Sequence, residues 1–142
     1  MRAGAIILVG VVAALVTAGC MMGQSNPAAV AKASQAAESW LQSIDSANYT
    51  GSWTAAAAFF RHAVKQDQWV ESMEAFRAPL GKNLSRAVGT SRYTTTMPGA
   101  PDGEYVFLQY KASFEKKKAA VESVTLLADT DGVWRVSGYF IK

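Results

Sequence analysis

Three arginines and three tyrosines carry the side chains that could form a polar binding site. They are Arg77, Arg86, Arg92, Tyr93, Tyr110 and Tyr139. Guanidinium groups hold carboxylates and phosphates through paired hydrogen bonds, and tyrosine rings add flat contact area. If the fold brings these side chains together, they predict a cleft for an anionic ligand. The alternative, which we favour because the spacing does not show convergence, is that the arginines pair with Glu71, Glu74 or Glu122 or lie in solvent.

Catalytic chemistry has few candidate residues in this sequence. His62 is the only histidine, and a general base needs a nucleophile or a carboxylate beside it, which the spacing does not supply. Asp67 is the nearest carboxylate in sequence and is more simply explained by the positive start of a helix. Nucleophile-elbow, P-loop, zinc-protease and dinucleotide-binding motifs are all missing from the sequence. We therefore expect no catalytic residues, no metal and no cofactor, with a small cleft enzyme as the alternative.

Residues 98–105 form a loop in which two prolines limit the conformational freedom that binding would have to remove. Loops held by a rigid scaffold often carry function. Pro98, Pro101, Asp102 and Tyr105 are therefore candidates for a partner contact, and a plain connection between two strands is the alternative. Residues 115–118, Glu-Lys-Lys-Lys, are expected to keep a hairpin tip soluble, with weak contact to anionic lipid as the alternative.

The first nineteen residues have the features of an export signal. Arg2 is followed by a mostly apolar run without charges, which ends in Val16-Thr17-Ala18-Gly19-Cys20. This ending resembles the bacterial lipobox, in which the cysteine is acylated and becomes the new N-terminus, although Thr17 stands where the lipobox usually has leucine. Ordinary signal cleavage and an uncleaved membrane anchor are the alternatives.

These features divide the chain into a signal peptide at 1–19, an acylated Cys20 with a short tether at 20–26, and one domain at 27–142. The predicted location is the cell envelope, with the lipid on Cys20 as the membrane contact. Resemblance to Gram-negative lipoproteins implies the outer membrane, facing the periplasm. The formal net charge of +3 is too small for a nucleic-acid-binding protein, and a single cysteine excludes an internal disulfide.

The first part of the domain has the periodicity of helices. Asn26-Pro27 provides a cap and a first helical residue, and apolar residues recur every three or four positions to about Ile44. Further helices are expected over residues 49–63 and 65–77, the last ending before Pro79. We expect Trp40 to lie in the core.

The second part has the alternation of strands, rich in valine, tyrosine, phenylalanine and threonine. Strands are expected near residues 84–97, 104–114, 119–129 and 133–141. Asp131-Gly132 predicts a tight turn, since both residues tolerate positive φ. The alternation in residues 121–128 predicts a sheet with one face covered by helices. This order of elements predicts an α+β fold, with N-terminal helices packed on a C-terminal four-stranded antiparallel meander, and it resembles the cystatin-like or NTF2-like roll.

Several short motifs together resemble an uncharacterised bacterial family, domain of unknown function 4019. They are Trp40-Leu41 with Asp45 and Tyr49, Ser52-Trp53, Gln68-Trp69, Arg77 with Pro79-Leu80-Gly81, Arg86, residues 98–105, Phe114, Lys117, residues 122–126 and residues 131–139. The resemblance implies an exported small domain and supplies no mechanism. The leading hypothesis is a non-enzymatic envelope lipoprotein that binds a protein or a small ligand. A cleft enzyme of the NTF2-like sort and a structural or stress-related envelope component are the alternatives.

Overall fold

The longest helix, α1 (Pro27–Asp45), begins where the sequence predicts, because the Asn26 side chain accepts a hydrogen bond from the Ala29 backbone N–H. The computed structural model describes residues 25–142, so the predictions for residues 1–24, including Cys20, lie outside the described residues. The helices α2 (Tyr49–Thr54), α3 (Ala58–Ala63) and α4 (Gln66–Phe76) follow, with a short 3₁₀ helix η1 (Ala78–Leu80). Among the described residues, no helix is both long and apolar enough to cross a membrane.

The prediction of a single helix over residues 49–63 is wrong, because the helix is interrupted between α2 and α3. Ala57 has extended backbone angles (φ −60°, ψ 148°), and its N–H donates to the Val136 carbonyl at 2.8 Å. A backbone hydrogen bond to a strand thus replaces a helical one at this position. The break brings α3 against the last strand.

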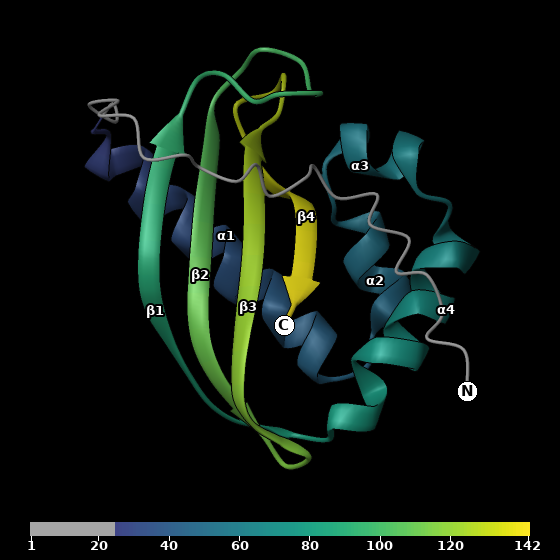
Figure 1. The fold of residues 1–142 in the computed structure, drawn as a ribbon. Helices are drawn as coiled ribbons and strands as arrows, with labels where there is room; N and C mark the ends of the chain where they lie inside the picture. Colours follow the sequence, from purple (N-terminus) through teal and green to yellow (C-terminus); the bar gives the residue numbers. More distant parts are fainter. Residues whose placement is uncertain (1–24) are drawn as a thin grey trace.

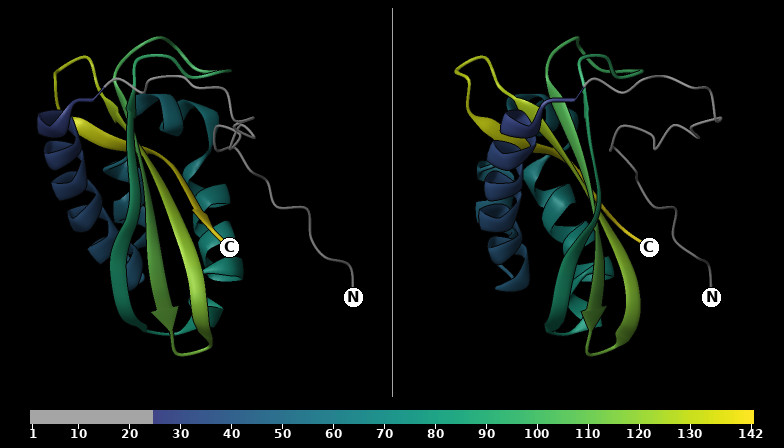
Figure 2. Two further views of the ribbon diagram at one scale, coloured as in Figure 1. Left: turned by 60° about the vertical axis from the view of Figure 1, so that its left-hand side comes forward. Right: turned by 90° about the vertical axis from the view of Figure 1, so that its left-hand side faces the viewer.

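Four strands form one antiparallel sheet in the order of the sequence: β1 (Asn83–Thr94), β2 (Tyr105–Phe114), β3 (Lys117–Ala128) and β4 (Trp134–Ile141). The helices lie on one side of this sheet, with α1 crossing behind it and α2 to α4 beside β4 (Figures 1 and 2). The predicted α+β meander is therefore confirmed. In the turn before β4, the Gly132 N–H donates to the Asp129 carbonyl at 2.8 Å and Gly132 has a positive φ (79°), so the tight turn predicted at Asp131-Gly132 is confirmed.

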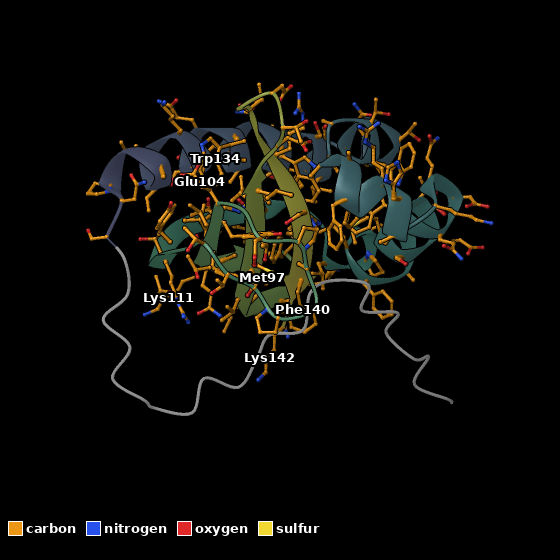
Figure 3. The ribbon with its side chains drawn as sticks, turned by 90° about the horizontal axis from the view of Figure 1, so that it is seen from above. Met97, Glu104, Lys111, Trp134, Phe140 and Lys142 are labelled. Carbon is orange, nitrogen blue, oxygen red and sulfur yellow. The ribbon has the colours of Figure 1, made fainter. Side chains whose placement is uncertain are left out.

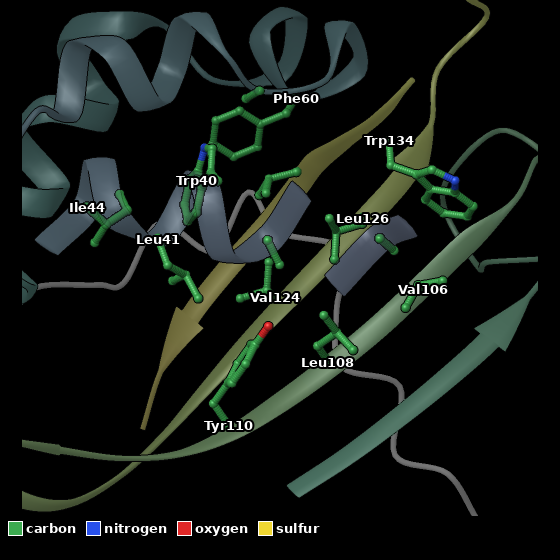
Figure 4. Close-up of a cluster of buried hydrophobic side chains, with 14 of the residues drawn as sticks. Trp40, Leu41, Ile44, Phe60, Val106, Leu108, Tyr110, Val124, Leu126 and Trp134 are labelled. Atoms are coloured by element: carbon green, nitrogen blue, oxygen red, sulfur yellow. The ribbon is translucent and has the colours of Figure 1, made fainter. Parts of the chain in front are cut away.

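The core fills the space between α1 and the sheet with large side chains (Figure 4). Trp40 is 4 % exposed, as predicted, and its ring lies 6.0 Å from that of Trp69 and 5.2 Å from that of Tyr139. Both indole N–H groups donate to Ser52, Trp40 to its carbonyl and Trp69 to its hydroxyl, at 2.9 Å each. Aromatic packing and satisfied polar groups thus fix α1, α2 and α4 relative to β4.

Candidate functional site

A cluster of charged side chains lies where the last turn of α1 meets the sheet. Its centre is Arg86, which projects from β1. Arg86 donates from Nη1 and Nη2 to the two carboxylate oxygens of Asp45 at 2.8 and 2.9 Å. Its Nε donates to Oε1 of Glu122 on β3 at 2.6 Å. One guanidinium thus joins α1 to β1 and β3 through hydrogen bonds from all three of its nitrogens.

The Glu122 carboxylate is fully buried, with 0 % exposure, between Arg86 and Tyr139. Its second oxygen accepts a hydrogen bond from the Tyr139 hydroxyl. A buried carboxylate is tolerated only when charges and donors surround it, and these two side chains supply both. Burial and then the negative charge of Glu122 raise the pKa of Tyr139 well above its usual value.

Arg77 joins the cluster from the end of α4. It is 3 % exposed, and its Nη2 donates to Asp45 at 3.2 Å while Nη1 donates to the Gly81 carbonyl at 2.7 Å. Its guanidinium carbon also lies 4.6 Å from the centre of the Phe114 ring, within range of a cation–π interaction. The η1 turn and α4 are thereby tied to α1.

The electrostatics of Asp45 and Arg86 follow from this geometry. Partial burial acts to raise the pKa of Asp45, but hydrogen bonds and charge from Arg86 and Arg77 outweigh it and lower the pKa below its usual value. Burial likewise acts to lower the pKa of Arg86, but the hydrogen bonds that Arg86 donates to Asp45 and Glu122 outweigh it and raise the pKa. Both groups are therefore held in their charged forms.

Within the described part of the chain, two buried polar atoms at the cluster lack a hydrogen-bond partner: Arg77 Nε and the Tyr110 hydroxyl. Tyr110 lies on β2 and is 3 % exposed. Burial, with a smaller contribution from the charge of Glu38, raises its pKa to about 12. The hydroxyl therefore stays protonated under ordinary conditions and is a poor general base.

The cluster contains four of the six arginines and tyrosines that the sequence singled out: Arg77, Arg86, Tyr110 and Tyr139. The other two lie elsewhere. Arg92 pairs in register with Phe107 on the opposite side of the sheet, and the Tyr93 hydroxyl donates to Glu104 at 2.9 Å. Sequence reasoning did not place Asp45 in a site, although Asp45 stands at the end of the first helix and among the motif residues of the family resemblance. The guanidinium groups of Arg77 and Arg86 are paired with Asp45, and that of Arg86 also with Glu122. The cluster is therefore an internal brace between elements.

The loop after β1, residues 95–104, folds back onto the side of the sheet that faces away from α1. Met97 is 5 % exposed and packs with Tyr105, Leu127 and Ala57. Tyr105 is fully buried, and its hydroxyl donates to the Pro101 carbonyl at 2.6 Å. The sequence placed Tyr105 on a partner surface, but its side chain is closed off by its own loop. Pro98, Pro101 and Asp102 are exposed.

An open groove of about 530 Å³ lies between the start of α1, the same loop and the turn before β4. Figure 3 shows two of its lining residues, Glu104 and Trp134, side by side at this end of the domain. Lys32 and Asn26 line it from the α1 side and Thr130 from the turn. The groove therefore combines one aromatic ring with polar and charged groups of both signs.

The remaining candidates for catalysis lie apart from these features. His62 is exposed in the last turn of α3, and Asp67 is exposed in the first turn of α4, where it accepts a hydrogen bond from the Gln68 N–H at 2.9 Å. Within residues 25–142, no three histidine, cysteine, aspartate or glutamate side chains are grouped as metal ligands would be.

Residues 36–139 match the model of a protein family of unknown function, DUF4019. The chain belongs to the DUF4019 family. The match spans the cluster from Asp45 to Tyr139, and confirms the resemblance that the short motifs predicted.

Among solved structures, the DUF4019 domain is similar to Aln2 from a Streptomyces species. The two are 13 % identical, with a TM-score of 0.52 over 83 % of this chain and 92 % of that one. At this identity the likeness shows the fold alone, and it is consistent with an NTF2-like α+β fold. No curated protein matches the sequence.

Proposed function

We propose that this DUF4019 protein is a cell-envelope lipoprotein, anchored through an acylated Cys20 after removal of residues 1–19. Its domain binds an envelope protein or a small ligand and does not catalyse a reaction. In a Gram-negative cell it lies on the outer membrane and faces the periplasm.

The observation that carries the anchoring is the order Val16-Thr17-Ala18-Gly19-Cys20 after an uncharged run. The fold is compatible with it, because Asn26 already caps α1 and the domain begins directly after a short tether. An acylated N-terminal cysteine carries the two or more chains that stable anchoring needs.

The packing of the domain favours binding over catalysis. A cleft enzyme of this fold needs ionisable groups around a cavity between helix and sheet, and here Trp40, Trp69 and Tyr139 fill that region. The carboxylates of Asp45 and Glu122 are held by arginines. The open groove near Trp134 lies on the outside of the domain and supports binding there.

Intact mass and membrane partition in a Gram-negative host test the anchoring. The wild type is expected to lack residues 1–19, to carry acyl chains on Cys20 and to sediment with membranes. Cys20→Ala is expected to lose the acyl chains, while Ser25→Ala, which changes the tether and keeps the cysteine, behaves as wild type. A chain that keeps residues 1–19, or is cut elsewhere and released, would contradict lipid anchoring.

A photo-reactive amino acid at Lys32, which lines the groove, tests binding at that place. It is expected to give a discrete crosslinked product in intact cells, and Thr130→Arg, which fills the groove, is expected to abolish it. Thr50→Arg on the exposed side of α2 is the matched control and should have no effect. Equal crosslinking in both variants would argue against the groove.

A further inference from the structure

The side of the sheet that faces away from α1 is built from regular rows of residues across the strands. One row runs from Ala87 to Lys111, Val121 and Lys142, and backbone hydrogen bonds pair the last two at 2.9 and 3.0 Å. The next rows contain Gln109, Ser123 and Phe140, and then Arg92, Phe107, Thr125 and Gly138. Lys111, Phe140 and Lys142 all lie on this side, away from the helices (Figure 3). We call these three rows the open face.

The three rows of the open face carry charge of one sign, and exposed Asp102 lies in the loop that packs on the end of this side. Arg92, Lys111 and Lys142 are exposed, and no ion pair within the described part of the chain neutralises them. None of the residues in the three rows is an aspartate or a glutamate. A terminal carboxylate on Lys142 would offset one of these charges, so the positive character depends on Arg92 and Lys111 as well. The opposite side of the domain is different, since α1 and α4 carry Glu38, Asp67, Glu71 and Glu74.

Apolar side chains lie between these cations. Val121 is 37 % exposed and Phe140 is half-buried, while Phe107, also half-buried, packs against the cluster of Met97 and Leu127. An open sheet face with cations around partly exposed aromatic rings is complementary to the headgroup region of a bilayer, which offers phosphates at the surface and hydrocarbon just below.

We propose that the open face docks on a bilayer surface containing anionic phospholipid, so that the domain lies with its sheet against the membrane. This inference rests on the proposed lipid anchor, because a tether raises the local concentration of the surface. The six residues 21–26 between Cys20 and α1 reach at most about 20 Å, which keeps the domain beside the membrane. In this orientation α1 and α4, with their acidic side chains, face away from the lipid. The groove faces away from the lipid or opens parallel to its surface.

Each cation near an anionic surface strengthens binding about fivefold, so three supply on the order of a hundredfold. This is too weak to hold a free domain firmly and sufficient to orient one that is already tethered. The orientation is therefore expected to depend on salt, because screening weakens attraction between exposed charges.

Thiol accessibility of the processed full chain on vesicles tests the docking. Ala87→Cys places a thiol in the row of Lys111, and Ala75→Cys places one on the exposed side of α4 as the matched control. On vesicles of phosphatidylcholine with phosphatidylglycerol, a water-soluble maleimide is expected to label position 87 several-fold more slowly than on phosphatidylcholine alone. Position 75 is expected to react equally on both, and high salt restores labelling at position 87.

Charge-reversal variants separate lipid docking from other causes of protection. Lys111→Glu with Lys142→Glu is expected to abolish the protection at position 87, and Lys32→Glu with Lys65→Glu, an equal change of charge on the helical side, is expected to keep it. Labelling of position 87 at the same rate on both vesicles would overturn the docking. Protection that appears only in cell envelopes and not on vesicles would also overturn it and indicate a protein partner.

Flotation distinguishes failure of the docking from failure of the anchor. A lipidated chain floats with phosphatidylcholine vesicles whether or not it docks. If the chain does not float with phosphatidylcholine, the anchor proposal fails. If it floats with both vesicles while position 87 is labelled at the same rate on both, the anchor stands and the docking fails.

Discussion

Arg86 donates from Nε to Glu122 at 2.6 Å, although the Glu122 carboxylate is completely buried. Arg86→Met keeps the hydrocarbon of the side chain and removes this donor, which leaves Glu122 with only the Tyr139 hydroxyl. Breaking a buried pair by removing one partner costs about 3–5 kcal/mol. We expect the free energy of unfolding in urea to fall by that amount.

The partner substitution shows whether the cost arises from an uncompensated charge. Glu122→Gln added to Arg86→Met is expected to recover part of the loss, because it removes the buried negative charge. Coupling energies between contacting residues are about 0.5–3 kcal/mol. If Arg86→Met alone unfolds within about 1 kcal/mol of wild type, the cluster is not the brace that its geometry indicates.

Tyr110 and Tyr139 provide a matched pair of phenylalanine substitutions. The Tyr110 hydroxyl is buried without a partner, so Tyr110→Phe removes an unsatisfied group and is expected to leave stability unchanged or raised by about 1 kcal/mol. Tyr139→Phe removes a donor to buried Glu122 and is expected to cost about 1–3 kcal/mol. Thermal unfolding of both variants measures the difference, and a destabilised Tyr110→Phe would indicate a partner for its hydroxyl.

Alkaline pH should destabilise the domain through these same tyrosines. Burial raises the pKa of Tyr110 to about 12, against 10.0 in the unfolded chain, and raises the pKa of Tyr139 well above its usual value. A raised native pKa means that the stabilising contribution is complete below pH about 10 and is lost as pH rises through the native pKa values. The urea midpoint of wild type is expected to fall between about pH 10 and 12, and Tyr110→Phe to fall less steeply. Parallel curves would refute this role for Tyr110.

Local signals explain why the start of α1 and the faces of β3 could be predicted. Asn26 and Pro27 act on their own helix, and the alternation around Val124 reflects a strand period of two, so neither depends on distant contacts. The break at Ala57 depends on Val136, some eighty residues away, which no local pattern of α2 or α3 contains.

The candidate site was harder to predict for the same physical reason. Glu122 was recognised as a possible arginine partner, but Asp45 enters the cluster only because α1 ends beside β1. Tyr105 has the residue type of a surface contact in a proline-containing loop. Tyr105 is buried because that loop folds back over Leu127. This tertiary contact cannot be predicted from the composition of the loop.

Tyr105→Phe tests how the loop after β1 is held against the sheet. The change keeps the buried ring and removes the hydrogen bond to Pro101, which is expected to cost about 1 kcal/mol. Because Gly103 and Ala100 donate backbone hydrogen bonds within this loop, their amides should exchange with deuterium faster in the variant. Tyr93→Phe, which removes an exposed hydrogen bond to Glu104, is the control and should change exchange at Ala100 little. Unchanged exchange in Tyr105→Phe would mean that packing of Met97, and not the hydroxyl, fixes the loop.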